Sequence, residues 1–535
     1  MKSKYILTLC LISIFLLISF NRCEEKLDFY PEDRISTANF PETEDDVKML
    51  LNGIYSQLRC NAIYTQGGYG CFGIVDGATP NAYAPWGDVP MSTLGQGILS
   101  SDDGHIVTFR WTRSYSIINK ANFLFEQIEK VELDEETKST FVGEAHFLRG
   151  YAYSVLANTY GRVPIITSSI SSKEARTISQ SSVEETWNQA ISDYNTAIEK
   201  LDVDAPEVGR ATKGSALGMK MRAYLYQNKF EKVLEVVEEI EALNKYSLFP
   251  SYKGLFDGAN ENNSEVIFDV QYMRGENSQG SLHDQYCGTG TGSWTRGTRY
   301  VPIEDLVEAY EMAPEEERLD PEEYHEVPSQ GPYQGRDPRL YFTCVLPHTE
   351  ILDHKFPSYI YPGGAYTHPG NPKKNLSSRK YFYDDMDKLP PAGQSDINYI
   401  VIRYADVILS KAEAIIETGG NVDEAIDLIN KIRRDRDDVT LTELPYGMSR
   451  EEARDTLRHE RRIEFALESL YWSDIKRWHE LDGYADEIYP VEVRDRHGNL
   501  IEAKFPDGYK DYYKYLPIPD GELSLNENLE QNPGW

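Results

Sequence analysis

The stretch YADVILSKAEAIIETGGNVDEAIDLINKIRRDR, residues 404–436, predicts two helices joined by a short polar turn. Apolar residues recur at helical spacing on both sides of Gly419 and Gly420, and this glycine pair separates the two helices. Small side chains lie where the two helices would cross: Ala412, Ala414 and Ala425. Small residues at a crossing and a short turn are typical of tetratricopeptide-type helix pairs.

A second stretch of the same kind covers residues 213–240, KGSALGMKMRAYLYQNKFEKVLEVVEEI. A helix through Ala216 and Ala223 breaks around Asn228 and resumes after Phe230. The two copies are degenerate and are not consecutive in the chain. The pattern therefore predicts an irregular helical scaffold rather than a regular solenoid.

Three further helices are expected before the first pair, over residues 43–58, 141–161 and 186–201. The first begins at Thr43 with Asp46 three residues on, which is a capping-box pattern. The other two carry apolar stripes at helical spacing, and the second ends near Gly161.

Long tracts rich in glycine, proline and serine separate these helices, at residues 59–105, 274–300 and 313–400. Structureless loops of this length are usually functional or disordered, and their aromatic content argues against disorder. The predicted fold class is mostly α, an irregular helical scaffold with tetratricopeptide-type helix pairs and long loop-rich insertions.

The amino terminus reads as a lipoprotein-type signal peptide over residues 1–22. Lys2 and Lys4 precede a 16-residue apolar run, shorter than the roughly 20 residues of a bilayer-spanning helix. A cysteine, Cys23, follows directly, as in a lipobox where the thiol is acylated. Arg22 departs from the small residue usual before that cysteine, so a plain secreted protein with a poor cleavage site is the alternative.

Composition excludes some classes of partner. The formal charge is −32, which repels phosphate backbones, so nucleic acid is not expected as a ligand. No cysteine lies in a C-x-x-C pair, so a structural zinc site is not expected. No other metal and no cofactor is predicted. Cys60 and Cys71 could form a disulfide in an exported protein, or both could be free thiols.

The catalytic motifs that this sequence resembles are each incomplete. HERRI, residues 459–463, begins like the zinc-protease motif H-E-x-x-H but ends in isoleucine. GTGTGS, residues 288–293, lacks the third glycine of a nucleotide loop, and no G-x-S-x-G elbow is present. Carboxylate pairs for glycoside hydrolysis stay open, because that test is a distance in space; surface charge is the favoured interpretation. No catalytic residue is predicted.

One charged cluster on a predicted helix resembles an active site, namely Arg461, Arg462, Glu464 and Glu468. Spacings of three and four place opposite charges on one helix face, which favours structural ion pairs along that helix. Trp472 and Trp478 follow near the apolar side, so both are expected in the core.

Several segments together resemble the SusD-like (RagB/SusD) lipoproteins. The similar segments run in the family's order from Cys23 to Trp535: YPEDRISTANFPETEDDVKMLLNGIYSQL, YSIINKANFLFEQI, GEAHFLRGYAYSVLANTYGRVPII, GRDPRLYFTCVLP, YIVIRYADVILSKAEAIIETGG, HERRIEFALESLYWSDIKRW and KYLPIPDGELSLNENLEQNPGW. Two departures are Arg22 in the lipobox and Ser469 where glycine is common.

The resemblance implies a non-catalytic nutrient-binding lipoprotein on the outside of the cell outer membrane, attached to lipid through acylated Cys23. It also implies a SusC-like TonB-dependent transporter as partner and an oligosaccharide or polysaccharide as ligand. Three regions are expected: the signal peptide 1–22, an N-terminal helical region 23–245, and a C-terminal RagB/SusD region 246–535 packed with the first as one unit. A peptide-binding subunit, a secreted glycoside hydrolase and a purely structural partner of the transporter remain as alternatives.

Two loops combine aromatic planes with polar side chains, as the recognition of a sugar ring requires. The first loop, residues 76–90, carries Asn81, Tyr83, Trp86 and Asp88 between prolines and glycines. The second, residues 283–300, carries Trp294, Arg296 and Tyr300. These seven residues are the predicted ligand contacts. The alternative is that the aromatic side chains only pin the loops to the helical scaffold.

If Cys23 is the acylated residue, Cys23→Ala should leave the protein unprocessed or unanchored. Metabolic labelling with a fatty-acid analogue should then mark the wild type alone. Equal labelling of the two proteins would contradict the predicted anchor.

Overall fold

The computed structural model of the protein describes residues 40–59, 74–83, 90–103, 106–274, 280–281, 301–320, 327–328, 333–346, 349–351, 354–355, 376–383, 388, 390–391, 394–439, 441–494 and 499–535. Several predicted features lie outside these residues: the signal peptide, Cys23, Cys60, Cys71, Trp86, Asp88, Trp294, Arg296 and Tyr300. Within them, no helix combines the length and the apolar character that crossing a bilayer requires.

Helices dominate the described residues. The α-helices are α2 (Glu44–Tyr55), α3 (Pro90–Gly95), α4 (Ile106–Gln127), α5 (Glu135–Tyr160), α6 (Ser172–Ala175), α7 (Val183–Lys200), α8 (Lys213–Leu225), α9 (Phe230–Ala242), α11 (Glu304–Ala309), α12 (Arg339–Thr343), α13 (Tyr404–Glu417), α14 (Val422–Arg434), α15 (Arg450–Glu464), α16 (Tyr471–Asp482), α17 (Tyr484–Ile488) and α18 (Asp520–Leu525). The 3-10 helices are η2 (Ser56–Leu58), η3 (Ile74–Ala78), η4 (Ile128–Lys130), η5 (Lys253–Leu255), η7 (Glu315–Glu317) and η9 (Asp511–Lys514).

Short strands form two-stranded antiparallel ladders, paired as β1–β3, β2–β8, β4–β7, β5–β6 and β9–β10. Their bounds are β1 (Ala82–Tyr83), β2 (Val266–Val270), β3 (Val301–Pro302), β4 (Cys344–Val345), β5 (Glu350–Ile351), β6 (His354–Lys355), β7 (Ser377–Ser378), β8 (Tyr399–Arg403), β9 (Val491–Arg494) and β10 (Leu500–Lys504). The predicted mostly α fold class is confirmed.

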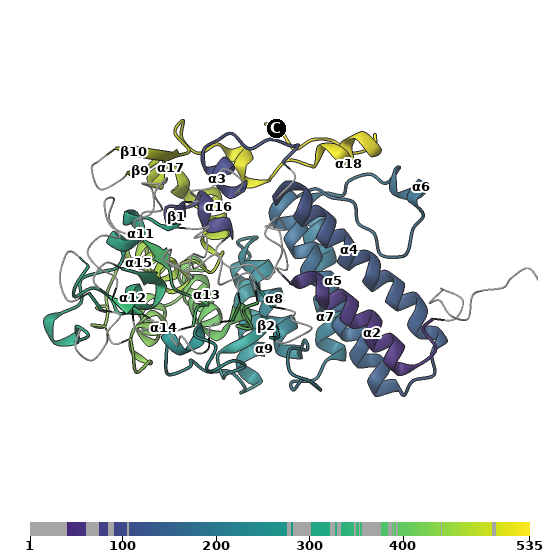
Figure 1. Cartoon of the computed structure of the whole chain (residues 1–535), viewed down its shortest axis with the longest axis horizontal. Coiled ribbons are helices and arrows are strands. Elements are labelled where there is room, and N and C mark those ends of the chain that lie inside the picture. The colour runs from purple at the N-terminus through teal and green to yellow at the C-terminus, as the bar shows by residue number, and fades with distance from the viewer. Residues whose placement is uncertain are drawn as a thin grey trace, which may run out of the picture.

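The N-terminal helices α2, α4, α5 and α7 pack side by side at one end of the molecule (Figure 1). Helix α2 has the predicted capping box, since Thr43 Oγ1 accepts from the Asp46 amide and Asp46 Oδ2 accepts from the Thr43 amide. Helices α5 and α7 approach closely at Gly150, where a Cβ would lie 3.1 Å from the Ala190 carbonyl oxygen. A larger residue at this position would push α7 away.

The two predicted helix pairs are α8–α9 and α13–α14. Asn228 ends the first pair's turn with a φ of 55°, where a short polar side chain is tolerated. Although far apart in sequence, the pairs are neighbours, because α9 packs against α13. Lys411 Nζ on α13 donates to Glu241 Oε1 on α9 at 2.9 Å. The scaffold is therefore continuous in space while its repeats are separated in the chain.

Strands β2 and β8 link the two halves of the chain and set up a buried ionic centre. Their register pairs Val266 with Arg403 and Val270 with Tyr399. The ladder packs on α8 at Gly218, where a Cβ would lie 2.9 Å from the Ile402 side chain. This register places Arg403, the last residue of β8, next to Glu265, which immediately precedes β2.

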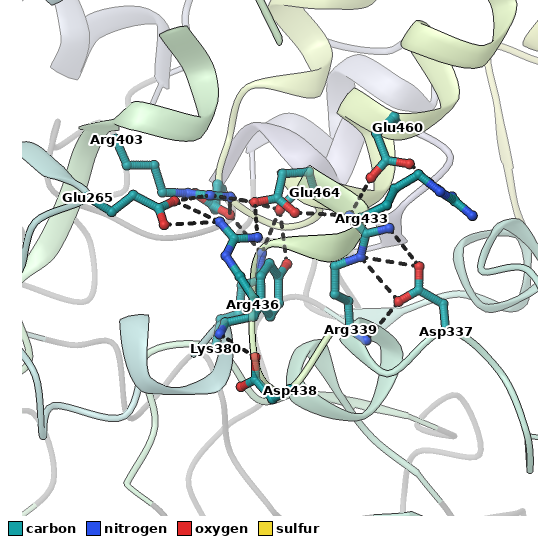
Figure 2. Close-up of polar contacts among 12 residues, drawn as sticks. Glu265, Asp337, Arg339, Lys380, Arg403, Arg433, Arg436, Asp438, Glu460 and Glu464 are labelled. Atoms are coloured by element: carbon teal, nitrogen blue, oxygen red, sulfur yellow. Dashed lines mark hydrogen bonds and ion pairs between the residues drawn. The ribbon is translucent and has the colours of Figure 1, made fainter. Parts of the chain in front are cut away.

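Figure 2 shows this ionic centre, in which carboxylates and guanidiniums alternate. Arg403 Nη1 donates to Glu464 Oε1 at 2.6 Å and to Glu265 Oε1 at 2.8 Å. Arg436 bridges the same two carboxylates at 2.9 Å each. Arg339 Nη1 reaches the other oxygen of Glu464 at 3.0 Å. These groups are at most 2 % exposed, so water contributes little to their neutralisation.

A second buried centre lies between α13, α15 and α16. Arg461 Nη1 donates to Asp406 Oδ1 at 3.1 Å, and Arg461 Nε donates to Asp474 Oδ2 at 3.1 Å. Glu413 accepts from Arg477 Nη2 at 2.7 Å and from the Trp478 indole at 2.7 Å. The expected core positions of Trp478 and Trp472 are confirmed, at 0 % and 5 % exposure.

The expectation of structural ion pairs is confirmed, but the predicted partners are wrong. Arg461 and Glu464 do not pair along the face of α15; each pairs with residues of other elements. Helical spacing makes a same-helix pair possible, but the Arg461 and Glu464 side chains reach carboxylates and guanidiniums of other elements instead. The cluster therefore ties elements together instead of supporting one helix.

The ionic centres also shift the acidity of their carboxyl groups. Burial opposes ionisation of Asp406, but Arg222 and Arg461 outweigh it and lower the pKa to about 2. Burial likewise opposes ionisation of Glu464, and Arg436, Arg403 and Arg339 hold its pKa below the usual range. A lowered pKa stabilises the fold above the ordinary carboxyl range, and that contribution is lost as the pH falls through the folded-state value.

Glu464→Gln should strongly destabilise the protein, by about 3–5 kcal/mol, since breaking a buried ion pair leaves the other partner's charge uncompensated. Here Arg403 and Arg436 would lose their shared carboxylate. Urea unfolding followed by circular dichroism measures the change.

The matched control is Glu235→Gln on α9, where Glu235 forms an exposed pair with Lys232 at 2.7 Å. Exposed pairs contribute little, so this variant should unfold with the wild type. Equal midpoints for both variants would show that the buried centre does not hold the fold together.

Candidate ligand-binding site

Two loops that the sequence marks as ligand-binding are joined at their bases. Strand β1 pairs antiparallel with β3, so that Ala82 faces Pro302 and Tyr83 faces Val301. The Ile303 amide adds a hydrogen bond to the Asn81 carbonyl at 3.1 Å. The chain that leaves Tyr83 toward Trp86 and the chain that arrives at Val301 from Trp294 therefore start side by side.

Two of the predicted contacts, Asn81 and Tyr83, lie in this ladder and are buried, at 0 % and 3 % exposure. Asn81 Oδ1 accepts from Arg462 Nε at 2.9 Å. In this structure both side chains anchor the base of the loop, and a direct ligand contact would require the segment to move. The other five predicted residues, Trp86, Asp88, Trp294, Arg296 and Tyr300, lie outside the described part of the chain, so their role stays a prediction.

Arg462, which the sequence suggested only as part of a helix-face ion pair, is the main clamp of this base. Its Nη2 donates to the Pro80 carbonyl at 3.2 Å and to Asp305 Oδ1 at 2.5 Å. One guanidinium thus connects α15, the end of the first loop's base and α11, which follows β3. A planar, multidentate donor suits this junction better than a lysine would.

Asp76 fastens the other end of the base. Its Oδ2 accepts from the Ser469 amide at 3.0 Å. Burial raises the pKa of Asp76 to about 7, because a fully enclosed carboxylate loses its hydration. Ser469 has a φ of 65°, in the left-handed region that favours glycine, so the backbone at this position is strained by a serine.

The extreme carboxy-terminal part of the chain completes the clamp. Tyr489 donates its hydroxyl proton to the Ala78 carbonyl at 2.8 Å, and Lys504 Nζ donates to the Gly77 carbonyl at 2.5 Å. No local pattern pointed to these contacts, because a side chain that binds a distant backbone carbonyl leaves no periodic signal. The base of the candidate site is consequently held on every side by the C-terminal half.

The arrangement suits binding on a rigid support. A stiff base loses little conformational entropy when a ligand orders the loops it carries. Two carboxylates of the base, Asp76 and Asp305, are engaged by a backbone amide and a guanidinium. In the described part of the chain, no group of three or more His, Cys, Asp or Glu side chains is placed to hold a metal ion.

Comparison with known proteins places this geometry in a family. The model of the SusD family matches residues 264–535, and a model described as starch-binding and associating with the outer membrane matches residues 43–225. The SusD-like protein P25 of Formosa agariphila is 27% identical over 545 aligned residues, which cover 97% of each chain.

Solved structures share the fold. A SusD-like protein from Bacteroides fragilis superposes with a TM-score of 0.74 at 25% identity, covering 92% of this chain and 97% of the other. A SusD-like carbohydrate-binding protein from the same species gives a TM-score of 0.77 at 23% identity, covering 91% and 99%. The resemblance seen in the sequence is confirmed, and the chain belongs to the SusD family.

Proposed function

We propose that this protein is a cell-surface glycan-binding lipoprotein that captures oligosaccharides and delivers them to a SusC-like TonB-dependent transporter in the outer membrane. The observation that carries the proposal is the β1–β3 ladder, which roots two aromatic loops at one place in a SusD-family fold. The name of one solved relative, a SusD-like carbohydrate-binding protein with the same fold, supports the same ligand class.

Chain length limits how far each of the two predicted tryptophans can lie from the ladder. Trp86 is three residues from Tyr83, and an extended chain spans at most ~3.3–3.6 Å per residue, so its Cα lies within about 11 Å of the ladder. Trp294 is seven residues from Val301 and lies within about 25 Å by the same measure. Because the two loops leave one base, we expect a single extended oligosaccharide to contact both.

The residue types fit sugar recognition. The C–H face of a pyranose packs on an aromatic plane, which Trp86, Trp294 and Tyr300 supply. Its hydroxyls need directional partners, which Asp88 and Arg296 supply. Prolines in the first loop reduce the entropy that the loop loses when it binds.

Export and anchoring complete the proposal. The lipobox-like start with Cys23 supplies the attachment to outer-membrane lipid. A formal charge of −32 keeps an exposed binding surface soluble and unreceptive to nucleic acid. Capture is a binding step only, so no catalytic residue is assigned.

Trp86→Ala should weaken binding of the native glycan by at least about tenfold, equivalent to about 1.4 kcal/mol. Loss of an aromatic contact alone removes on the order of 0.5–1.5 kcal/mol beyond its buried area. Trp294→Ala should act likewise if its loop shares the cleft. Titration calorimetry against a glycan and peptide panel, with the soluble form that begins at Glu24, measures both effects.

The contrast variant is Trp478→Ala, which empties a fully buried site and leaves the Glu413 carboxylate without its indole donor. It should lose roughly 3–5 kcal/mol of stability, as large core truncations do, while the loop variants should melt with the wild type. Loop variants that melt early yet bind normally would make Trp86 and Trp294 structural. If the protein binds peptides of the panel and no glycan, its ligand class is peptide rather than glycan.

A protein that delivers its ligand to a transporter needs a specific contact with that transporter, which typically buries at least about 1,000 Å². Extraction in a mild detergent should therefore recover the full-length protein together with a SusC-like barrel. Recovery of the protein alone, under conditions that preserve other outer-membrane complexes, would contradict the partnership.

A further inference from the structure

A two-chambered cavity lies between the N-terminal helices and α16, and the β1 and β3 residues of the ladder are not among its lining residues. The inner chamber has a volume of about 120 Å³ and the outer one about 460 Å³. The two adjoin, because six residues line both: Asn158, Trp187, Tyr226, Ser473, Lys476 and Lys514. Helices α5, α7, α8 and α16 contribute to its walls, and η9 contributes Lys514.

Lys476 is a buried lysine that lines both chambers of the cavity. It is 5 % exposed, and its Nζ donates to Asn158 at 2.6 Å (backbone carbonyl) and 3.1 Å (Oδ1). No described carboxylate lies within ion-pair distance of this ammonium. An ammonium carries three donors, so one donor is left for the cavity. A buried charge without a counter-ion is costly.

Arg110 on α4 is a second cation of the inner chamber. Its one direct side-chain contact among the described residues is a long hydrogen bond from Nη1 to Thr159 Oγ1 at 3.4 Å. Its buried Nε has no partner. No described carboxylate pairs with this guanidinium either. Two cations that lack counter-ions therefore line one small chamber.

Most of the other charged groups of the cavity already have partners. Arg222 binds Asp406 at 2.7 Å, and Glu468 is held by Lys380 at 2.7 Å and by Arg403 at 2.8 Å. In the outer chamber Arg477 binds Glu413 and Lys514 pairs with Glu480. Lys229 and the exposed Glu184 lie at the outer chamber. The phenols of Tyr151, Tyr226, Tyr399 and Tyr515 complete the titratable groups. The unbalanced charge is thus positive and centred on Lys476 and Arg110.

We propose that this cavity is a binding site for a carboxylate anion, held between the Lys476 ammonium and the Arg110 guanidinium. A guanidinium and an ammonium are the side chains that bind carboxylates by charge-assisted hydrogen bonds. Ser473 and Asn158 supply further polar contacts in the wall. The proposal does not depend on the proposed glycan site at the aromatic loops.

The size of the cavity limits the anion. The inner chamber is smaller than a 150 Å³ cavity that holds benzene, so it accommodates a carboxylate head group and little more. The outer chamber lies in the size range of small-molecule pockets. Trp187 and Tyr226 line both chambers, and aromatic faces suit a sugar ring. A sugar acid and a short free carboxylic acid both satisfy these limits.

The lowered pKa of Lys476 should make anion binding depend on pH. Burial, with the nearby charges of Lys514 and Arg110, lowers its pKa to about 7. An anion beside the amine favours the protonated form. Binding should therefore take up a proton at neutral pH, and affinity should weaken toward tenfold per pH unit above pH 7.

Titration calorimetry on the soluble form that begins at Glu24 tests the site with three probes: galacturonate, neutral galactose and acetate. Galacturonate should bind and galactose should not. If acetate also binds, a short free carboxylic acid is sufficient as the ligand. If acetate does not bind, the ligand is the sugar acid. Equal binding of galactose and galacturonate, or no binding of either acid, would overturn the proposal.

Lys476→Met and Arg110→Met should each weaken binding of the acid by at least tenfold, while Lys232→Met, on the exposed face of α9, should not. Trp86→Ala should leave acid binding unchanged, which separates this site from the aromatic loops. If Lys476→Met fails to fold, the pH profile and the proton uptake of the wild type still decide. Affinity that is unchanged between pH 6 and pH 9, with no proton uptake, would overturn the assignment.

Discussion

Arg403, Glu464, Arg436 and Glu265 form a closed set of buried ion pairs on which the architecture depends. Each charge is enclosed, so each is tolerated only while its partners are in place. The partners come from β8, from α15 and from the segments that precede β2 and follow α14. The ionic centre therefore selects one mutual arrangement of these elements, whereas apolar contacts alone would permit several.

The helices could be predicted from the sequence because their signals are local. The capping box at Thr43, the break at Asn228 and the glycine pair at 419–420 all lie within a turn of the feature they determine. The partners of Arg461 and Glu464 could not be predicted in the same way. Their ion pairs cross from one element to another, and spacing along α15 carries no information about residues elsewhere in the chain.

The candidate site was likewise only partly predictable from the sequence. Residue types marked the two aromatic loops, but only the structure shows that β1 and β3 root them together. Asn81 and Tyr83 fit a binding loop by composition, yet they serve the base in this structure, since a polar side chain between glycines and prolines anchors a turn as readily as it contacts a ligand. Arg462, Ser469 and Lys504 had no local signal as parts of this base.

The clamp around residues 76–83 has a consequence for how the molecule is made. The residues that hold this early segment are synthesised much later. The contact between the Gly77 carbonyl and Lys504 joins residues that are 427 positions apart in the chain. Such contacts form late, because long chain loops must close first. The N-terminal helices can pack on local contacts as soon as they are made, but the base of the two candidate loops forms only when the C-terminal half is present. A chain that ends before Lys504 would lack side chains that hold this base, so the order of synthesis makes the base one of the last parts of the fold to assemble.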